Sequence, residues 1–264
     1  MINKVGKNKE QDLLGKWFPL NPSKRKDIFL ATKFGHLKHN PANLQDTRAI
    51  NTTPEYCHDA LEASLKRLGL PYGKIKYLGW SERSADSLRR AHATHPISCV
   101  QMEYNPFCLD IESPKYRLLE TARELGVAIV AYSPLGNGLL SGTLRLKEDF
   151  TKPGDLRGGV PWVSDDDFQT NLAIVDKIGE IAKATGVTAA QLTLAWILAQ
   201  GEDFLVIPGT TKVHRVAENL GSLDIIVTTA EEKAICQASE RVVGGRFPEA
   251  IMEYCFADTP ALEA

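Results

Sequence analysis

The sequence predicts an α/β fold in which a parallel sheet is covered by helices on its outer face. Short apolar segments of strand length alternate along the chain with longer amphipathic segments of helical period. The 264 residues, 43% of them hydrophobic, are enough to bury a substantial core. This length suits one large α/β barrel or two small domains.

The predicted strands are apolar runs, each separated from the next by a helical pattern, as expected for parallel strands. They span residues 28–33, 75–79, 97–104, 127–132 and 204–207. Capping residues mark the predicted helices: Thr53 and Pro54 begin a helix that Gly69 ends. Further helices are predicted over residues 84–92, 113–125, 167–185 and 188–199, around Arg215, and from a capping box of Thr229 and Glu232.

The charge and the cysteine content exclude several classes of protein. The net charge is −2 and the basic residues are spread along the chain, which argues against a nucleic-acid partner. No apolar run approaches the ~20 residues of a membrane span, and residues 1–16 lack the apolar core of a signal peptide. The histidines show no metal-ligand spacing, so we expect no metal site. The cysteines are odd in number and far apart, as in the reduced thiols of a cytoplasmic protein: Cys57, Cys99, Cys108, Cys236 and Cys255.

Polar side chains stand at the end of every predicted strand. In parallel α/β folds the carboxyl ends of the strands meet at one edge of the sheet, where function is concentrated. A purely structural sheet does not require polar residues there. The candidates are Lys33, Ser81, Glu82, Gln101, Tyr132, Ser133, Thr210 and Thr211.

Residues 206–219 have the pattern of a phosphate site. An apolar strand ends in Pro208-Gly209, and two threonines, Lys212 and Arg215 follow as a helix begins. Backbone N–H groups at a helix N-terminus, backed by cations, bind phosphate. Glu218 and Asn219 come one turn later, where they could face the sugar or base of a nucleotide. The alternative is an ordinary surface helix with a charged first turn.

The loop over residues 133–142 contains glycines in a spacing close to that of a dinucleotide-binding loop. Ser141 takes the place of the third glycine, and the loop runs into an irregular segment rather than a helix. This departs from the Rossmann pattern. We interpret it as a barrel-rim loop that folds over a ligand, with an ordinary surface loop as the alternative.

Taken in order, the motifs resemble those of the aldo-keto reductases. They are Ala31-Thr32-Lys33-Phe34-Gly35, Leu65-Lys66-Arg67-Leu68-Gly69, Gly73-Lys74-Ile75-Lys76-Tyr77-Leu78-Gly79-Trp80-Ser81-Glu82, Val100-Gln101-Met102-Glu103-Tyr104-Asn105-Pro106-Phe107, Ala131-Tyr132-Ser133-Pro134-Leu135-Gly136, and the segment 206–219. The resemblance, which is strongest to pyridoxal-reductase-like and aryl-alcohol-dehydrogenase-like members, implies a (β/α)8 barrel that binds NADP(H) and reduces aldehydes or ketones.

The resemblance also assigns cofactor-binding residues. Ser81 and Gln101 would hold the nicotinamide carboxamide, with Glu82 beside them, and Tyr132 would stack on the nicotinamide ring. The loop residues Ser133, Pro134, Leu135, Gly136, Asn137 and Gly138 would cover the pyrophosphate. The 2′-phosphate and adenosine would be held by Gly209, Thr210, Thr211, Lys212, Arg215, Glu218 and Asn219. Arg215 would select NADP over NAD, because a guanidinium makes bidentate contacts with phosphate. Many family members have a lysine at the position of Gly209.

The catalytic set of the family is an Asp, a Tyr, a Lys and a His, and only Lys33 has a counterpart here. The tyrosine is the acid that protonates the carbonyl oxygen, and the lysine lowers its pKa. The segments that would carry the other three residues have no match. By chemistry alone, the candidates for a replacement acid are Tyr56, Tyr72, His36 and His39.

The barrel is expected to be incomplete. Five strands match the family's third, fifth, sixth, seventh and eighth, and the first, second and fourth have no counterpart, so residues 1–264 form one partial barrel domain. The exposed strand edges of such a domain favour self-association.

Three functions follow as hypotheses. The first is an NADP(H)-dependent reductase of a small carbonyl substrate. The second is a non-catalytic dinucleotide-binding protein or inactive fragment. The third is a barrel enzyme in which Lys33 forms a Schiff base while residues 209–211 bind a substrate phosphate.

Overall fold

The computed structural model describes residues 9–35, 51, 53–70, 75–152, 155–252 and 254–259. The chain divides into two compact units, residues 2–76 and residues 77–264. Three of the candidate replacement acids, His36, His39 and Tyr72, lie outside the described residues.

In the N-terminal unit, helix α1 (Lys9–Leu20) packs against helix α2 (Pro54–Leu68). Thr53 caps α2, and Gly69 ends it in the left-handed conformation with φ 63°, as the sequence predicts. The Nε of Arg67 donates to Oε1 of Gln11 at 2.6 Å across the helix pair. The helices approach so closely that a Cβ on Gly15 would lie 1.9 Å from the carbonyl oxygen of Arg67. A short 3-10 helix, η1 (Pro22–Asp27), follows α1.

The prediction of a buried strand over residues 28–33 is wrong. These residues have no regular secondary structure, and the side chain of Phe29 is 77% exposed. A buried strand needs hydrogen-bonded neighbours, and the regular elements described in this unit are all helical. Lys33 lies in this irregular segment, and it is exposed.

The C-terminal unit contains a parallel sheet of four strands in consecutive order, β1 (Leu78–Ser81), β2 (Ile97–Glu103), β3 (Ala128–Tyr132) and β4 (Phe204–Val206). Its helices are α3 (Ala85–Thr94), α4 (Leu118–Glu124), α5 (Phe168–Ala184), α6 (Ala189–Leu198), α7 (Val213–Leu220), α8 (Thr229–Ser239) and α9 (Glu249–Met252). Among the described helices none is long and apolar enough to cross a bilayer by itself, and α5 with α6 would reach that length only as a pair bent by 90°.

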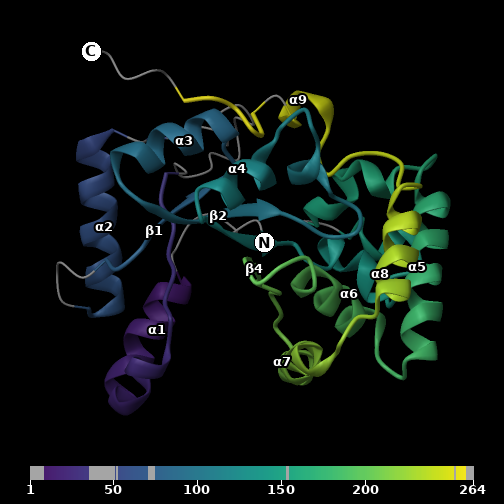
Figure 1. The fold of residues 1–264 in the computed structure, drawn as a ribbon. Coiled ribbons are helices and arrows are strands. Elements are labelled where there is room, and N and C mark those ends of the chain that lie inside the picture. The colour runs from purple at the N-terminus through teal and green to yellow at the C-terminus, as the bar shows by residue number, and fades with distance from the viewer. Residues whose placement is uncertain are drawn as a thin grey trace. The chain divides into compact units, whose positions relative to one another are not determined.

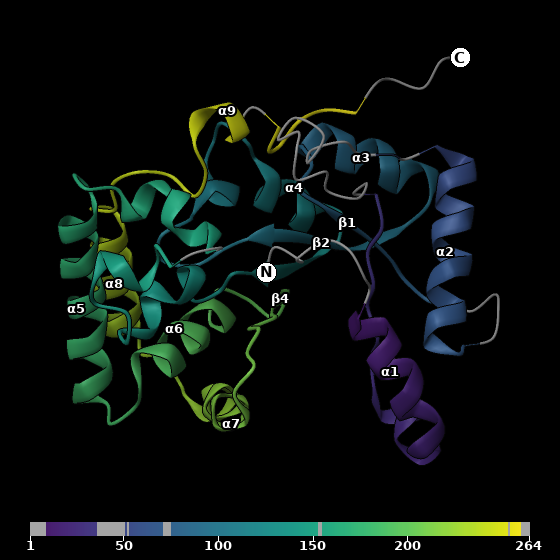
Figure 2. The same cartoon turned by 180° about the vertical axis from the view of Figure 1, so that it is seen from behind.

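The consecutive strand order identifies the sheet as barrel-like. Crossovers between parallel strands are right-handed, so a sheet that grows steadily in one direction has its crossover helices on one face. A doubly wound sheet reverses its strand order instead. α3 lies beside α4, and α5 lies beside α6 and α8 (Figures 1 and 2). The predicted parallel sheet with helices on its outer face is therefore confirmed for this unit.

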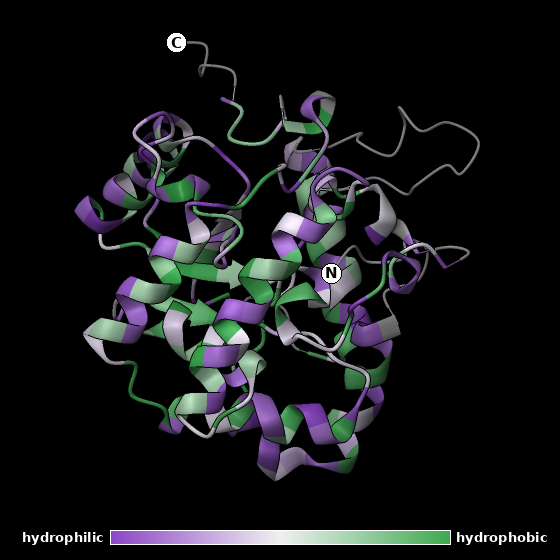
Figure 3. Cartoon of the chain, turned by 90° about the vertical axis from the view of Figure 1, so that its right-hand side faces the viewer, coloured by the Kyte–Doolittle hydropathy of each residue, from purple (hydrophilic) through white to green (hydrophobic). Residues whose placement is uncertain are grey.

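The two faces of the sheet differ in polarity and cover. One register row, made of Trp80, Val100, Ile129 and Phe204, faces the helices and joins the core. The next row faces the other way and contains Ser81, Gln101, Val130 and Leu205. Leu205 is 52% exposed. The helices carry both hydrophobic and hydrophilic residues, as expected for elements that cover a sheet (Figure 3).

Several predicted element bounds are corrected. β1 begins at Leu78 rather than at residue 75. α4 begins at Leu118 rather than at residue 113, after Arg117 at φ 48°. The capping box of α8 is Thr228 with Glu231, one residue before the predicted pair. Two threonines and two glutamates are adjacent there, so the pattern fits either pair. The capping box of Thr188 and Gln191 is confirmed.

Candidate functional site

The predicted nicotinamide residues meet at the carboxyl ends of three neighbouring strands. Ser81 is the register partner of Gln101, and the N–H of Glu82 donates to the carbonyl oxygen of Gln101 at 3.2 Å. Tyr132 ends β3 opposite Glu103. Because alternate residues of a strand share a face, Ser81, Gln101 and Tyr132 lie on the same face of the sheet. All three side chains are partly exposed there.

The predicted pyrophosphate loop is held from both sides. Pro134 and Leu135 lead into a 3-10 segment, η4 (Gly136–Ser141). The Nδ2 of buried Asn105 donates to the carbonyl oxygen of Ser133 at 3.0 Å, and Nη1 of Arg157 donates to that of Asn137 at 3.1 Å. The N–H groups of Gly136 and Gly138 donate to carbonyls within the loop. These two N–H groups are therefore occupied unless the loop opens.

The predicted phosphate segment forms an exposed helix start, as expected. α7 begins after Lys212, whose N–H donates to Oγ1 of Thr210 at 3.0 Å. Gly209, Thr211 and Lys212 are exposed, and Arg215 is partly exposed. Within the described parts of the chain, neither cation forms an ion pair. The C-terminal turn of α7 is fixed to α6, because Nε2 of Gln191 donates to the carbonyl oxygen of Glu218 at 3.1 Å. The carbonyl of Asn219 accepts from Oγ of Ser222 at 2.7 Å.

A buried arginine that the sequence analysis missed contacts this edge of the sheet. Arg246 lies between α8 and α9, and its side chain is 1% exposed. Its guanidinium donates to both carboxylate oxygens of Glu82, at 2.8 and 2.9 Å, and to the hydroxyl of Tyr132 at 3.0 Å. Oε2 of Glu103 lies 3.8 Å from Nη1 of Arg246, and Oδ2 of Asp110 lies 3.3 Å from its Nε. Arg246 follows two glycines in an irregular segment, and no periodicity or motif distinguishes it in the sequence.

Three carboxyl groups surround this single guanidinium. Glu82 takes two of its hydrogen bonds, while Oε1 of Glu103 has no hydrogen-bond partner among the described residues. Burial raises the pKa of Glu103 to about 8, against the lowering effect of Arg246. Burial also raises the pKa of Tyr132, with a further increase from the Glu82 carboxylate. Burial lowers the pKa of Arg246, but the hydrogen bond and charge of Glu82, together with smaller contributions from neighbouring groups, make the net shift upward.

Other contacts hold the C-terminal segment, by which we mean the described residues 242–252 and 254–259. Fully buried Asn171 exchanges hydrogen bonds with the backbone of Val243, at 2.9 and 3.1 Å. The ring of Phe256 stacks on Tyr116 with centroids 3.9 Å apart. The N–H of Thr259 donates to Oγ of Ser87 at 2.8 Å. The segment is thus anchored at several points besides Arg246.

The candidate catalytic Lys33 belongs to the N-terminal unit. In that unit Tyr56, the one candidate replacement acid among the described residues, lies in α2 with its ring centroid 6.5 Å from that of Phe34. Phe34 is the residue after Lys33. The structure thus places Tyr56 beside the neighbour of Lys33 in sequence.

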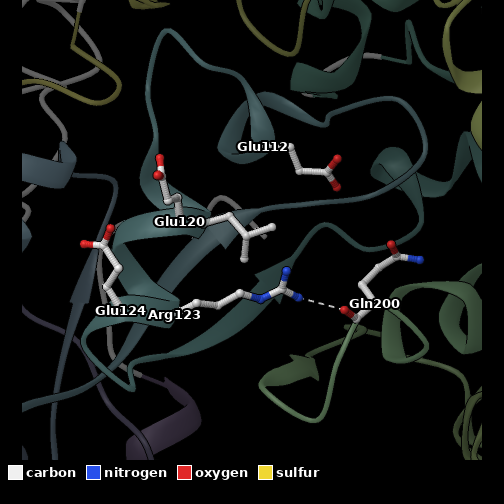
Figure 4. A pocket seen from close by; sticks show the side chains of 6 residues that line it. Glu112, Glu120, Arg123, Glu124 and Gln200 are labelled. Carbon is white, nitrogen blue, oxygen red and sulfur yellow. Dashed lines mark hydrogen bonds between the residues drawn. The ribbon is translucent and has the colours of Figure 1, made fainter.

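A separate open hollow lies at α4 and the turn after α6 (Figure 4). It is lined by Glu112, Leu119, Glu120, Arg123, Glu124 and Gln200. The Nη2 of Arg123 donates to the carbonyl oxygen of Gln200 at 2.7 Å, and its Nε donates to Asp203 at 2.9 Å, just before the amino end of β4. None of the predicted site residues lines this hollow. It is therefore distinct from the strand-end site, by which we mean Ser81, Gln101 and Tyr132 at the carboxyl ends of β1 to β3.

Comparisons with known proteins agree with the motifs. The model of the aldo/keto reductase family matches residues 71–241. The chain is 39% identical to the NADP(+) aldo-keto reductase yakc of Schizosaccharomyces pombe, over 96% of this chain and 82% of that protein. It is 42% identical to the aldo-keto reductase str7 of Strobilurus tenacellus, over 96% and 80% of the two chains.

Solved structures give the same result for the fold. A thermostable aldo-keto reductase, Tm1743, crystallised with the inhibitor epalrestat, matches with a TM-score of 0.61 and 25% identity, over 86% of this chain and 77% of that one. The glycerol dehydrogenase AKR11B4 of Gluconobacter oxydans matches in fold with a TM-score of 0.76 and 22% identity, over 90% and 79% of the two chains. With the matching family model and relatives near 40% identity over almost its whole length, this chain belongs to the aldo/keto reductase family.

Proposed function

We propose that this chain is an NADP(H)-dependent oxidoreductase that reduces a small aldehyde or ketone to an alcohol. The observation that carries the proposal is the placement of Ser81, Gln101 and Tyr132 on one face of the sheet, at the carboxyl ends of neighbouring strands. Family membership supports both the cofactor and the reaction class.

The residues of the strand-end site fit a dinucleotide. Tyr132 has an anchored hydroxyl and a partly exposed side chain, which suits stacking on an aromatic ring. Lys212 and Arg215 stand at the exposed start of α7 and form no ion pair within the described residues, so they are available to a phosphate. We assign the nicotinamide to Ser81, Gln101 and Tyr132, and the 2′-phosphate to Lys212 and Arg215. When bound, NADPH supplies the hydride.

The chain must also supply a proton to the carbonyl oxygen. We propose that Lys33 is the retained member of the catalytic set, with the role of lowering the pKa of a neighbouring acid. We further propose that the family's Asp, Tyr and His have no counterparts and that residues 1–264 form a single, incomplete barrel. The four strands of the described sheet and the 52% exposure of Leu205 on its inner face support the incomplete barrel. Tyr56, in the same unit as Lys33, is the described candidate for the acid.

The alternative is a non-catalytic protein that binds the dinucleotide. It is favoured by the meeting of Ser81, Gln101 and Tyr132 at one edge of the sheet, taken together with the proposed absence of the family's Asp, Tyr and His. The Schiff-base hypothesis is separate, and borohydride trapping of a carbonyl substrate on Lys33 would support it. A cytoplasmic location also stays a proposal, with support from the five cysteines, all of them free thiols.

NADPH oxidation in the presence of an aromatic aldehyde tests the proposal. We expect aldehyde-dependent oxidation by the wild-type chain, loss of this activity in Lys33→Met, and no change in Lys26→Met. Lys26 is an exposed lysine of the same unit, so it is a matched control. NADPH binding without oxidation would instead favour the non-catalytic alternative.

A further inference from the structure

Arg246 contacts two residues of the proposed cofactor site, Glu82 and Tyr132. We propose that Arg246 is a positioning residue for the nicotinamide end of the cofactor. It would act by fixing the ring of Tyr132 and the end of β1. The inference rests on the proposed function and assigns to it a residue of the C-terminal segment.

The contact with Tyr132 fixes the ring without covering it completely. The guanidinium reaches the phenolic oxygen at 3.0 Å, at the far edge of the ring, while the residue stays partly exposed. A tyrosine hydroxyl at a mostly buried position needs a polar partner, and one bond to it limits rotation of the side chain. Arg246 therefore leaves Tyr132 oriented before a ligand arrives, which lowers the entropic cost of binding.

The contact with Glu82 fixes the end of β1 in a backbone conformation that glutamate rarely adopts. Glu82 has φ 53°, in the left-handed region. Its N–H is bonded to Gln101, and its carboxylate is held at two points by Arg246. Such a conformation persists only when its surroundings determine it. Arg246 thus holds Ser81 and Gln101 in their mutual register through Glu82.

Arg246 also sets the charge of the site. Glu82, Glu103 and Asp110 are the acidic groups that lie within 4 Å of it, and Arg246 is the one cation in this described cluster. Without its charge, the carboxylates of Glu82 and Asp110 would face the anionic cofactor unopposed. The C-terminal segment has other anchors, at Asn171, Tyr116 and Ser87, so Arg246 is not its sole attachment.

The test compares Arg246→Lys and Tyr132→Phe with the control Arg90→Met. Tyr132→Phe keeps the stacking ring and removes only the hydroxyl that accepts from Arg246. Arg90 holds the far end of the same segment by donating to the carbonyl oxygen of Thr259 at 2.6 Å. NADPH and NADH are titrated by fluorescence, and thermal melting is measured for each variant.

We expect Tyr132→Phe and Arg246→Lys each to weaken NADPH binding about tenfold. NADH binding should weaken by the same factor, because the loss occurs at the nicotinamide end that both cofactors share. Arg90→Met should keep the wild-type Kd for both cofactors even if its melting temperature is lower. If Arg246 only stabilised the fold, Arg246→Lys would change the melting temperature, and Tyr132→Phe would bind NADPH with wild-type affinity.

Unchanged affinity in Tyr132→Phe, with a wild-type chain that binds NADPH, would overturn this inference and leave the proposed function standing. A wild-type chain that binds no NADPH would overturn both. If Arg246→Lys fails to fold, Tyr132→Phe decides the question.

Discussion

The guanidinium of Arg246 and the carboxylate of Glu82, 164 positions apart in the sequence, form a two-point ion pair at 2.8 and 2.9 Å. The arginine side chain is 1% exposed and the glutamate 24% exposed. The pair connects the C-terminal segment to the end of β1. It therefore ties the last described part of the chain to the first strand of the sheet.

Removal of one partner of this pair should be strongly destabilising. Glu82→Ala leaves a buried guanidinium without its main partner, which costs about 3 kcal/mol of the free energy of unfolding. Urea unfolding measures this loss. Glu120→Ala is the control, because its ion pair with Arg117 lies on the surface and should matter little. An equal effect of the two substitutions would contradict the structural role of Glu82.

The raised pKa of Glu103 predicts a pH dependence of stability. Its folded-state pKa of about 8 lies above the ordinary carboxyl value of 4.5, so the folded state keeps the proton to a higher pH than the unfolded chain does. The contribution of Glu103 is fully present below pH 4.5 and is lost as pH rises to about 8, because the unfolded chain ionises first.

The measurement is urea unfolding between pH 5 and pH 9. Glu103→Gln, which stays neutral, should lose less stability across this range than the wild-type chain. Glu180→Gln is the control, since Glu180 pairs with Lys177 on the surface. Parallel curves for the wild-type chain and Glu103→Gln would show that Glu103 is ionised in the folded state.

Two helical glycines should respond in opposite directions to alanine. At Gly15 the added Cβ meets the carbonyl oxygen of Arg67 at 1.9 Å, so Gly15→Ala should separate α1 from α2 and reduce stability. At Gly179, inside α5, a Cβ meets nothing within 4 Å. Gly179→Ala should therefore stabilise the chain by about 0.5–1 kcal/mol. Helicity and thermal melting distinguish the two, and tolerance of alanine at Gly15 would argue against this helix packing.

Exposed apolar residues in β4 and directly after it predict self-association. Leu205 is 52% exposed and Ile207 is 44% exposed, and β4 is the last strand in the described sheet. We expect size-exclusion chromatography to show species larger than the 29.1 kDa chain, and Leu205→Lys to shift them toward the monomer. Leu146→Lys, at another exposed leucine, should have no effect. A wild-type chain that elutes as a clean monomer would refute this prediction.

Local signals made much of the fold predictable. The caps at Thr53 and Thr188 depend on residues three positions away, so their helices were predicted with the correct N-caps. The pair Thr228 and Thr229 shows the limit, because adjacent residues of one type satisfy the same pattern. Residues 28–33 show a larger limit of local signals. They have strand propensity, but a strand also needs neighbouring strands to pair with, and the sequence pattern does not guarantee these.

The candidate site was predictable where its residues lie in motifs and not where they lie far apart. Ser81, Gln101 and Tyr132 stand at strand ends in family motifs, and the sheet register brings them to one face. Arg246 reaches the same place from an irregular segment 164 positions after Glu82. Only the folded chain shows that contact, so no local pattern predicts it.

The most direct test of the proposed cofactor site is a fluorescence titration with NADPH and with NADH, for the wild-type chain and Arg215→Ala. Lys233→Ala, at an exposed lysine of α8, is the matched control. The proposed site predicts saturable binding with a preference for NADPH that weakens about tenfold in Arg215→Ala alone, because a guanidinium–phosphate contact is lost. Equal affinity for the two cofactors, or no binding by a folded wild-type chain, would contradict it.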